Sequence, residues 1–206
     1  SHFSDSDGVN NDFTLSQIKT WNDLAEGTKK IFPEIKYIHM SNTYGHRYSD
    51  KINANTSRLG IGLYGLANIE GLDLKPVLEM KTIISGIKNI KKGDTVGYNN
   101  TFTAPNDMTI ATIPLGYYEG LDRRLSNKGY VKVNGKFCKI VGRVSMNITT
   151  IDITGIKNIK IGDPVQVISN IPSDKNSIHS ISEISDTIPY EAIISLPERL
   201  RRVVIR

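Results

Sequence analysis

The sequence is poor in cysteine and has no long hydrophobic run. Cys138 is the single cysteine among 206 residues, so no disulfide can form within the chain. Such usage is typical of proteins from a reducing compartment, and we expect a cytoplasmic protein. No run of about 18 consecutive apolar residues occurs, so we expect no membrane-spanning helix within this chain.

The amino-terminal segment also lacks the features of a secretion signal. Residues Ser1 to Asp7 contain neither a basic region nor an apolar stretch, and a signal peptide needs both. The sequence has no initiator methionine before Ser1. We therefore expect that it begins inside a longer protein.

Basic residues are in modest excess, with 26 Lys and Arg against 21 Asp and Glu and a net charge of +5. A basic excess can indicate nucleic-acid binding. Here the basic residues are scattered, apart from one cluster at the carboxyl end: Arg199, Arg201, Arg202 and Arg206. Those arginines could pair with carboxylates or phosphates inside a fold. We expect a solvated basic surface and no nucleic-acid partner.

The first third of the sequence alternates between helical and strand-like patterns. Apolar residues from Thr14 to Ile31 have helical spacing, and the Pro33 that follows ends the helix. Lys36 to Met40 is a candidate strand, Asp50 to Asn55 a short helix or turn, and Gly60 to Tyr64 a second apolar run. This order predicts βα units.

After residue 74 the pattern changes to short segments rich in Val, Ile, Thr and Tyr. The dipeptide Asn134-Gly135 between two of them predicts a two-residue hairpin. The mainly antiparallel strands are expected at residues 77–84, 96–103, 108–115, 129–133, 137–153 and 164–168. We expect one further helix after Ser180, with Ile181, Ile184 and Ile188 on one face, and a final strand over 197–206.

One short pattern occurs twice in this second part. Gly86 to Asp94 reads Gly-Ile-Lys-Asn-Ile-Lys-Lys-Gly-Asp and recurs almost unchanged from Gly155 to Asp163. Two copies are too few for a repeat architecture. We interpret them as one turn design that a β domain uses twice.

Three segments carry groups suited to binding and catalysis. Arg58 to Gly65 reads Arg-Leu-Gly-Ile-Gly-Leu-Tyr-Gly, and its glycines would let backbone N–H groups approach a phosphate. A candidate strand ends at Asn42 and Thr43, at the strand end where parallel barrels place their sites. The third segment combines Tyr98 with two glycine-flanked stretches, Leu115 to Gly120 and Val141 to Asn147. Each segment alone also fits a turn or a packing role.

In order and spacing, these segments together resemble the alanine racemase family, over nearly the whole chain. The resemblance implies the last βα units of a (β/α)8 barrel in residues 1–74 and a mainly antiparallel β domain in residues 75–206. It also implies pyridoxal 5'-phosphate as the cofactor and a homodimer whose active site combines both subunits. The cofactor lysine of the family lies in a Lys-Ala-Asn-Ala-Tyr-Gly-His type motif that this chain lacks. Asn42 to His46 is only superficially similar, because it has no lysine.

Residue roles follow from the resemblance one at a time. Thr43 takes the place of a family serine that binds the cofactor phosphate, with Asn42 beside it, and Gly60 and Ile61 would offer backbone N–H groups. Arg58 would face the pyridine nitrogen and keep it unprotonated, because a guanidinium does not give up its proton.

His2 would orient Arg58 from behind the site. Tyr98 matches the family's tyrosine base, which acts on one face of the substrate α-carbon while the lysine acts on the other. A free tyrosine has a pKa of about 10, so this role needs an activating environment. Tyr117 and Met146 would line the pocket for a small amino acid, and no metal ligands are implied.

Some residues depart from the family pattern. Ser145 and Asn147 stand where some relatives have Cys and Asp, and Glu198 falls near the position where some relatives have a phosphate-binding tyrosine, a role that a carboxylate would not fill. Serine-racemising relatives share this framework, so serine is an alternative substrate to alanine. A non-catalytic binding module is a second alternative, because the lysine motif is missing. A decarboxylase of the same fold is a third and weaker one, because Val144 to Asn147 does not resemble its Cys-Asp-Gly segment.

Overall fold

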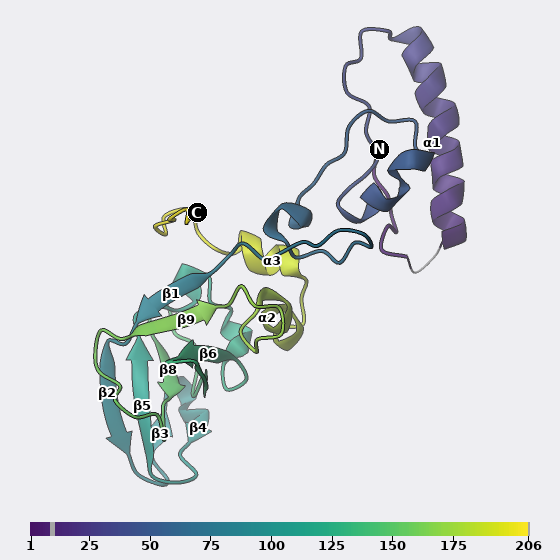
Figure 1. The fold of residues 1–206 in the computed structure, drawn as a ribbon. Coiled ribbons are helices and arrows are strands. Elements are labelled where there is room, and N and C mark those ends of the chain that lie inside the picture. Colours follow the sequence, from purple (N-terminus) through teal and green to yellow (C-terminus); the bar gives the residue numbers. More distant parts are fainter. Residues whose placement is uncertain (9–10, 206) are drawn as a thin grey trace. The chain divides into compact units, whose positions relative to one another are not determined.

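The computed structural model describes residues 1–8 and 11–205, which form two compact units, Ser1–Pro76 and Val77–Arg206 (Figure 1). Each unit has its own core. None of the helices among the described residues combines the length and apolar character that a membrane span requires.

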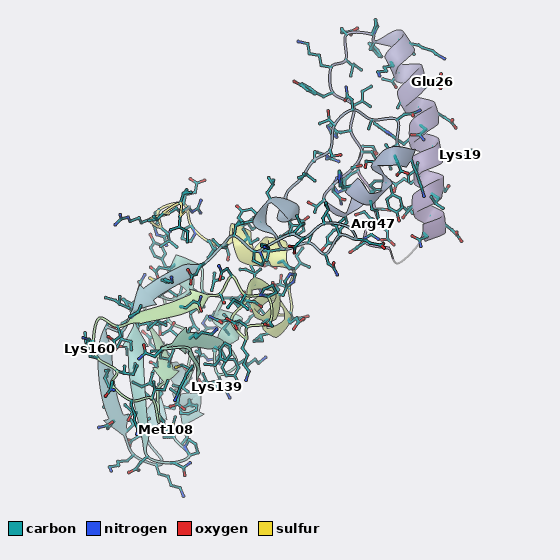
Figure 2. The ribbon with its side chains drawn as sticks, viewed as in Figure 1. Lys19, Glu26, Arg47, Met108, Lys139 and Lys160 are labelled. Atoms are coloured by element: carbon teal, nitrogen blue, oxygen red, sulfur yellow. The ribbon has the colours of Figure 1, made fainter. Side chains whose placement is uncertain are left out.

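The first unit is built around one long helix, α1 (Asn11–Ile31), which confirms the predicted helix. Its buried face carries Thr14, Ile18 and Ala25, whereas Lys19 and Glu26 lie on its exposed side (Figure 2). Two 3₁₀ helices follow, at Tyr44–Lys51 and Ile61–Tyr64. The helical turn expected over 50–55 therefore lies earlier in the chain. The core of this unit contains Phe3, Ile18, Met40, Tyr48 and Ile52.

The strand predicted at Lys36–Met40 is reduced to a single parallel bridge between His39 and Thr56. Asn55 explains the reduction. Its side chain accepts a hydrogen bond from Ile38 N (2.8 Å) and donates one to Lys36 O (2.7 Å). A side-chain amide thus takes the place of part of the backbone ladder. The two segments still run side by side, which brings Ser41 O within 3.0 Å of Arg58 N.

The second unit is an antiparallel β domain, as predicted. Its described strands form sheets in the orders β1-β9-β6-β7, β2-β5-β8 and β3-β4. The strands are β1 (Met80–Ile83), β2 (Gly86–Ile90), β3 (Thr95–Val96), β4 (Phe102–Thr103), β5 (Met108–Ile113), β6 (Tyr130–Val133), β7 (Lys136–Lys139), β8 (Thr149–Asp152) and β9 (Pro164–Ile168).

Side chains alternate between core and surface along these strands. In β6, Val131 and Val133 are fully buried while their neighbours are half-buried. Figure 2 marks Met108, which begins β5 and is buried in a cluster with Ile110 and Val141. Burial of branched apolar side chains on one face of each strand stabilises such a domain.

The two turn predictions are confirmed. Asn134 and Gly135 join β6 to β7 with positive φ values of 47° and 74°, the signs that a type I′ hairpin turn requires. In the duplicated pattern, Asp94 accepts from Lys91 N at 2.8 Å and Asp163 accepts from Lys160 N at 2.9 Å. Only the first copy begins with a strand, β2, so the duplication covers the turn and not the whole element.

Two predictions near the carboxyl end are wrong. The expected single helix is two, α2 (Ile178–Ile184) and α3 (Pro189–Ile194), because Asp186 has a φ of 51° and Pro189 starts a new helix. The expected final strand over 197–206 is irregular, with Val204 89% exposed. Arg206 lies outside the described residues.

Candidate active site

The predicted site residues form two groups, one in each unit. His2, Asn42, Thr43, Arg58, Gly60 and Ile61 belong to the first unit, and Tyr98, Tyr117 and Met146 belong to the second. Hydrogen bonds connect Thr43 with Gly60, Arg58 with His2, and the loops that carry Tyr117 and Met146.

Thr43 is the centre of the first group. Its hydroxyl oxygen accepts hydrogen bonds from Gly60 N (3.1 Å) and Gly62 N (3.3 Å), and the residue is 1% exposed. Both acceptor positions of the oxygen are then filled, so the hydroxyl proton can only be donated to a further acceptor. Gly62 allows this approach, because a Cβ there would lie 2.9 Å from Thr43 Cγ2.

Two neighbours of this loop contribute through the backbone or through a turn. The Ile61 side chain is 2% exposed and packs in the core, so only its backbone is available to a ligand. Asn42 Oδ1 accepts from Gly45 N (2.8 Å) and from Ser6 Oγ (3.0 Å), an arrangement that stabilises the turn at 42–45. Its ligand role stays a prediction.

Arg58 is held by three acceptors. Its Nη2 donates to Ser1 O (2.6 Å) and Met40 O (3.2 Å), and lies 2.8 Å from His2 Nδ1. Because a guanidinium can only donate, His2 Nδ1 accepts and Nε2 carries the ring proton. The 3.4 Å approach of Asn42 Nδ2 to that Nε2 therefore joins two donors and is not a hydrogen bond. The predicted neighbours His2 and Arg58 are brought together.

Tyr98 is 71% exposed and lies directly after a tight turn. Gly97 has a φ of 79°, and a Cβ on it would lie 2.9 Å from Arg143 N. On the opposite segment, a Cβ on Gly142 would lie 2.8 Å from Val96 O. The two backbones touch, so the position of Tyr98 depends on the Gly142 segment.

Asn127 joins these two segments, and sequence reasoning missed it. Its Nδ2 donates to Thr101 O and Oγ1, both at 3.2 Å, and its Oδ1 accepts from Gly142 N at 2.7 Å. Its φ of 61° is a conformation that Asn tolerates better than most residues. An asparagine near a glycine is a turn signal, but the turn's partners lie too far along the chain to be inferred.

Tyr117 and Met146 lie on two loops in direct contact. Tyr117 N donates to Ser145 O and Tyr118 N donates to Met146 O, each at 3.0 Å. A Cβ on Gly116 would lie 2.0 Å from Ser145 O, so only glycine fits. The segment 142–146 thus contacts the Tyr98 turn at one end and the Tyr117 loop at the other.

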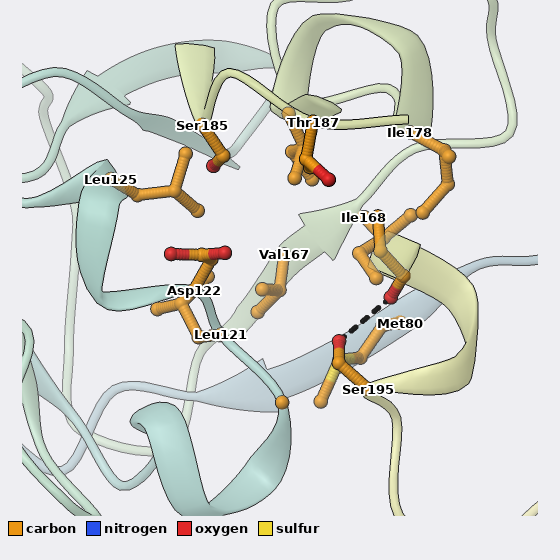
Figure 3. Close-up of a pocket in the computed structure, with 13 residues that line it drawn as sticks. Met80, Leu121, Asp122, Leu125, Val167, Ile168, Ile178, Ser185, Thr187 and Ser195 are labelled. Carbon is orange, nitrogen blue, oxygen red and sulfur yellow. Dashed lines mark hydrogen bonds between the residues drawn. The ribbon is translucent and has the colours of Figure 1, made fainter. Parts of the chain in front are cut away.

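Two other features of the second unit are not part of this site. Burial raises the pKa of the Cys138 thiol to about 11, so it is no nucleophile at neutral pH. Figure 3 shows a mainly apolar cavity of about 20 Å³ lined by Leu121, Leu125 and Val167, with Asp122 at its wall. Its volume suits one water and no amino acid.

Arg199 contacts an aromatic ring in place of the carboxylate or phosphate considered above. Its guanidinium carbon lies 3.5 Å from the ring centroid of Tyr118, and Nη2 donates to Tyr118 O. This cation–π contact stabilises the loop that carries Tyr117 and Tyr118.

The fold of this chain is shared with solved structures of alanine racemases. The structure is similar to that of alanine racemase from Bacillus anthracis with bound L-Ala-P, with a TM-score of 0.87 and 31% identity over 100% of this chain and 54% of that one. It is also similar to alanine racemase from Bartonella henselae with covalently bound pyridoxal phosphate, with a TM-score of 0.78 and 28% identity over 100% and 55%. The predicted fold class, barrel end followed by β domain, is confirmed.

The chain belongs to the alanine racemase family. Residues 1–68 match the alanine racemase N-terminal domain and residues 77–204 match the C-terminal domain. Alanine racemase 1 of Clostridium acetobutylicum is 32% identical over all of this chain and 55% of its own length. Alanine racemase of Borreliella burgdorferi is 37% identical over 92% and 51%. The chain spans about half the length of the curated relatives it matches.

Proposed function

We propose that this chain is the carboxyl-terminal part of a pyridoxal-phosphate-dependent enzyme that interconverts L- and D-alanine by two bases. It supplies Tyr98 as one base and part of the phosphate site, and the lysine base comes from the rest of the protein. The observation that carries this proposal is the double acceptance by Thr43 Oγ1 from Gly60 and Gly62. We place the reaction in the cytoplasm, where it provides D-alanine for the cell wall.

The donors around Thr43 fit a phosphate. The buried hydroxyl has one proton left to donate. The Gly60 and Gly62 N–H groups already donate to its oxygen, so the Ile61 backbone N–H is the donor of this loop that would bind the phosphate. Such converging donors bind anions without a formal charge from the protein. When bound, pyridoxal phosphate acts as an electron sink that makes the α-hydrogen of an amino acid acidic.

Arg58 keeps the cofactor ring nitrogen unprotonated. The guanidinium is a permanent donor, and Ser1, Met40 and His2 hold it in one orientation. An unprotonated ring withdraws fewer electrons, which favours simple proton exchange at the α-carbon over side reactions. His2 is a positioning residue here, because it acts through Arg58.

Tyr98 moves the proton on one face of the α-carbon. Its exposed ring is accessible to a site that a second subunit completes, so the proposal includes a homodimer. Tyr117 and Met146 line the pocket around a small substrate side chain. The hydrogen bonds between their loops fix the spacing of the two residues.

The test is Tyr98→Phe in the full-length protein loaded with pyridoxal phosphate. Racemisation should fall on the order of 1,000-fold, and equally in both directions, because the equilibrium constant between enantiomers is fixed. In D₂O, exchange of the α-hydrogen without inversion should persist for one enantiomer only, the one that the lysine deprotonates. Persistent exchange of both enantiomers would show that Tyr98 is not a base.

A further inference from the structure

Glu119 links the two loops that carry Tyr117 and Met146. Its Oε2 accepts a hydrogen bond from Gly116 N at 2.9 Å, and its Oε1 accepts one from Asn147 Nδ2 at 2.7 Å. Both carboxylate oxygens are therefore used, one within its own loop and one across to the facing loop. Hydrogen bonds to a charged acceptor are stronger than neutral ones.

The side-chain bridge acts together with the backbone contacts. Tyr117 N and Tyr118 N donate to Ser145 O and Met146 O, each at 3.0 Å. Glu119 follows these two donors directly, and Asn147 follows the two acceptors. The hydrogen bond between Glu119 and Asn147 thus follows the two backbone hydrogen bonds between the loops. It lies close in sequence to the exposed side chains of Tyr117 and Met146.

The pairing depends on the chemical type of residue 147. Glu119 offers only acceptors when ionised, and the Asn147 amide supplies the matching donor. An aspartate at this position would place two carboxylates about 2.7 Å apart, where like charges repel. This side-chain contact therefore needs a donor at position 147 when Glu119 is ionised.

We propose that Glu119 and Asn147 are a pair of positioning residues that sets the spacing of Tyr117 and Met146, and thereby how the pocket discriminates between alanine and serine. The inference rests on the proposed function and names the residues that decide its substrate. Glu119 and Asn147 act through the loops and do not touch the substrate.

The test compares three variants of the full-length protein: Asn147→Asp, Glu119→Gln, and the two combined. Asn147→Asp separates the loops, and the ratio of kcat/KM for alanine to that for serine should change on the order of tenfold, mainly through KM. In the double variant, the amide introduced at position 119 can donate to the carboxylate introduced at position 147. The contact between the loops then forms again, and the ratio should return to within about twofold of the original. Asn134→Asp, the same chemical change in an exposed hairpin turn, is the matched control.

A second readout does not need the cofactor. The Gly116 amide proton donates to Glu119, so its hydrogen exchange in the cofactor-free protein should accelerate in Asn147→Asp and slow again in the double variant. An unchanged alanine-to-serine ratio in Asn147→Asp would overturn the inference and leave the racemase proposal intact. Equal losses for both substrates together with a lower Tm would also overturn it, because they indicate a structural role only. A wild-type protein that racemises neither amino acid would overturn both.

Discussion

The two halves of the candidate site are built in opposite ways. In the first unit, Thr43 is 1% exposed and its oxygen is saturated by internal donors, so the binding group is prearranged before any ligand arrives. In the second unit, Tyr98 is 71% exposed and Met146 is 53% exposed, and their positions are fixed only through the loops beneath them. A buried polar group must be hydrogen-bonded within its own chain, because burial without a partner is costly. An exposed polar group is hydrated and can form its contacts later, when a second molecule binds. Substitutions in the two halves should therefore have different effects on stability, cofactor affinity and activity.

The largest effect should come from the backbone contact beneath the exposed half. In Gly116→Ala, the new Cβ would lie 2.0 Å from Ser145 O, and the loops must separate. Gly116 has a φ of −152°, which any residue can adopt, so the cost is purely steric. We expect a loss of about 3 kcal/mol in the free energy of unfolding, measured with urea.

The matched control is Gly135→Ala in the β6–β7 hairpin. Gly135 has a φ of 74°, and no atom lies within 4 Å of its added Cβ. This substitution costs about 1 kcal/mol for the left-handed conformation alone. If both variants lost equal stability, the close contact of the two loops would be refuted.

In the prearranged half, removal of one oxygen should affect stability and cofactor binding together. Thr43→Val keeps the shape but leaves the Gly60 and Gly62 amides without their acceptor. We expect a loss of about 1–3 kcal/mol in stability and a weaker affinity for pyridoxal phosphate, followed by absorbance titration. Thr43→Ser retains the oxygen and should behave like the wild type. Equal affinities of the Val and Ser variants would remove Thr43 from the phosphate site.

A smaller effect, confined to activity, should follow from Asn127→Asp. Aspartate also tolerates a positive φ, so the backbone is preserved, but the two donations to Thr101 are lost. The side-chain bridge from Thr101 through residue 127 to Gly142 is then broken, although the backbone contact between the two segments remains. We expect kcat to fall about tenfold, which corresponds to about 1.4 kcal/mol, with a nearly unchanged Tm. A large drop in Tm with unchanged kcat per folded molecule would contradict this positioning role.

The sequence allowed prediction of what depends on local chemistry. Asn134-Gly135 and the Lys91–Asp94 turn form from neighbouring residues, and both are as expected. The helix α1 follows from its spacing of apolar residues. In contrast, Asn55 replaces backbone ladder bonds with its side chain, and no periodicity reveals such a substitution. For that reason the sequence predicts a strand at 36–40 where the structure has only a single bridge between His39 and Thr56.

The candidate site shows the same division. The grouping of Thr43 with Gly60, and of His2 with Arg58, follows from the resemblance to a known family. Glu119 and Asn127 remained unrecognised because their partners lie 28 and 26 positions away along the chain, at Asn147 and Thr101. Contacts at such separation depend on how strands and loops pack, which residue type alone does not indicate.

The smallest effect should come from the exposed ion pair between Lys91 and Asp107. Its dependence on salt can be compared with that of a buried ion pair. The hydrogen bond from Lys91 is the main cause that holds the pKa of Asp107 below its ordinary value. A lowered pKa in the folded state means that the pair stabilises the protein above the ordinary aspartate range, about pH 4, and that this contribution is lost as the pH falls through the lowered pKa. Asp107→Asn should therefore slightly flatten the acid side of the stability curve, and only at low salt.

Asp174 provides the buried counterpart. Burial by itself raises the pKa of Asp174, but hydrogen bonds from Lys132 and Ser169 outweigh it, so the pKa is lowered. Its stabilisation should also be lost as the pH falls through that lowered pKa. Because the pair is buried, Asp174→Asn should flatten the acid limb at about 1 M salt as well. Urea unfolding from about pH 7 to about pH 3, at low and high salt, measures both variants. Identical salt responses would mean that burial does not separate the two pairs.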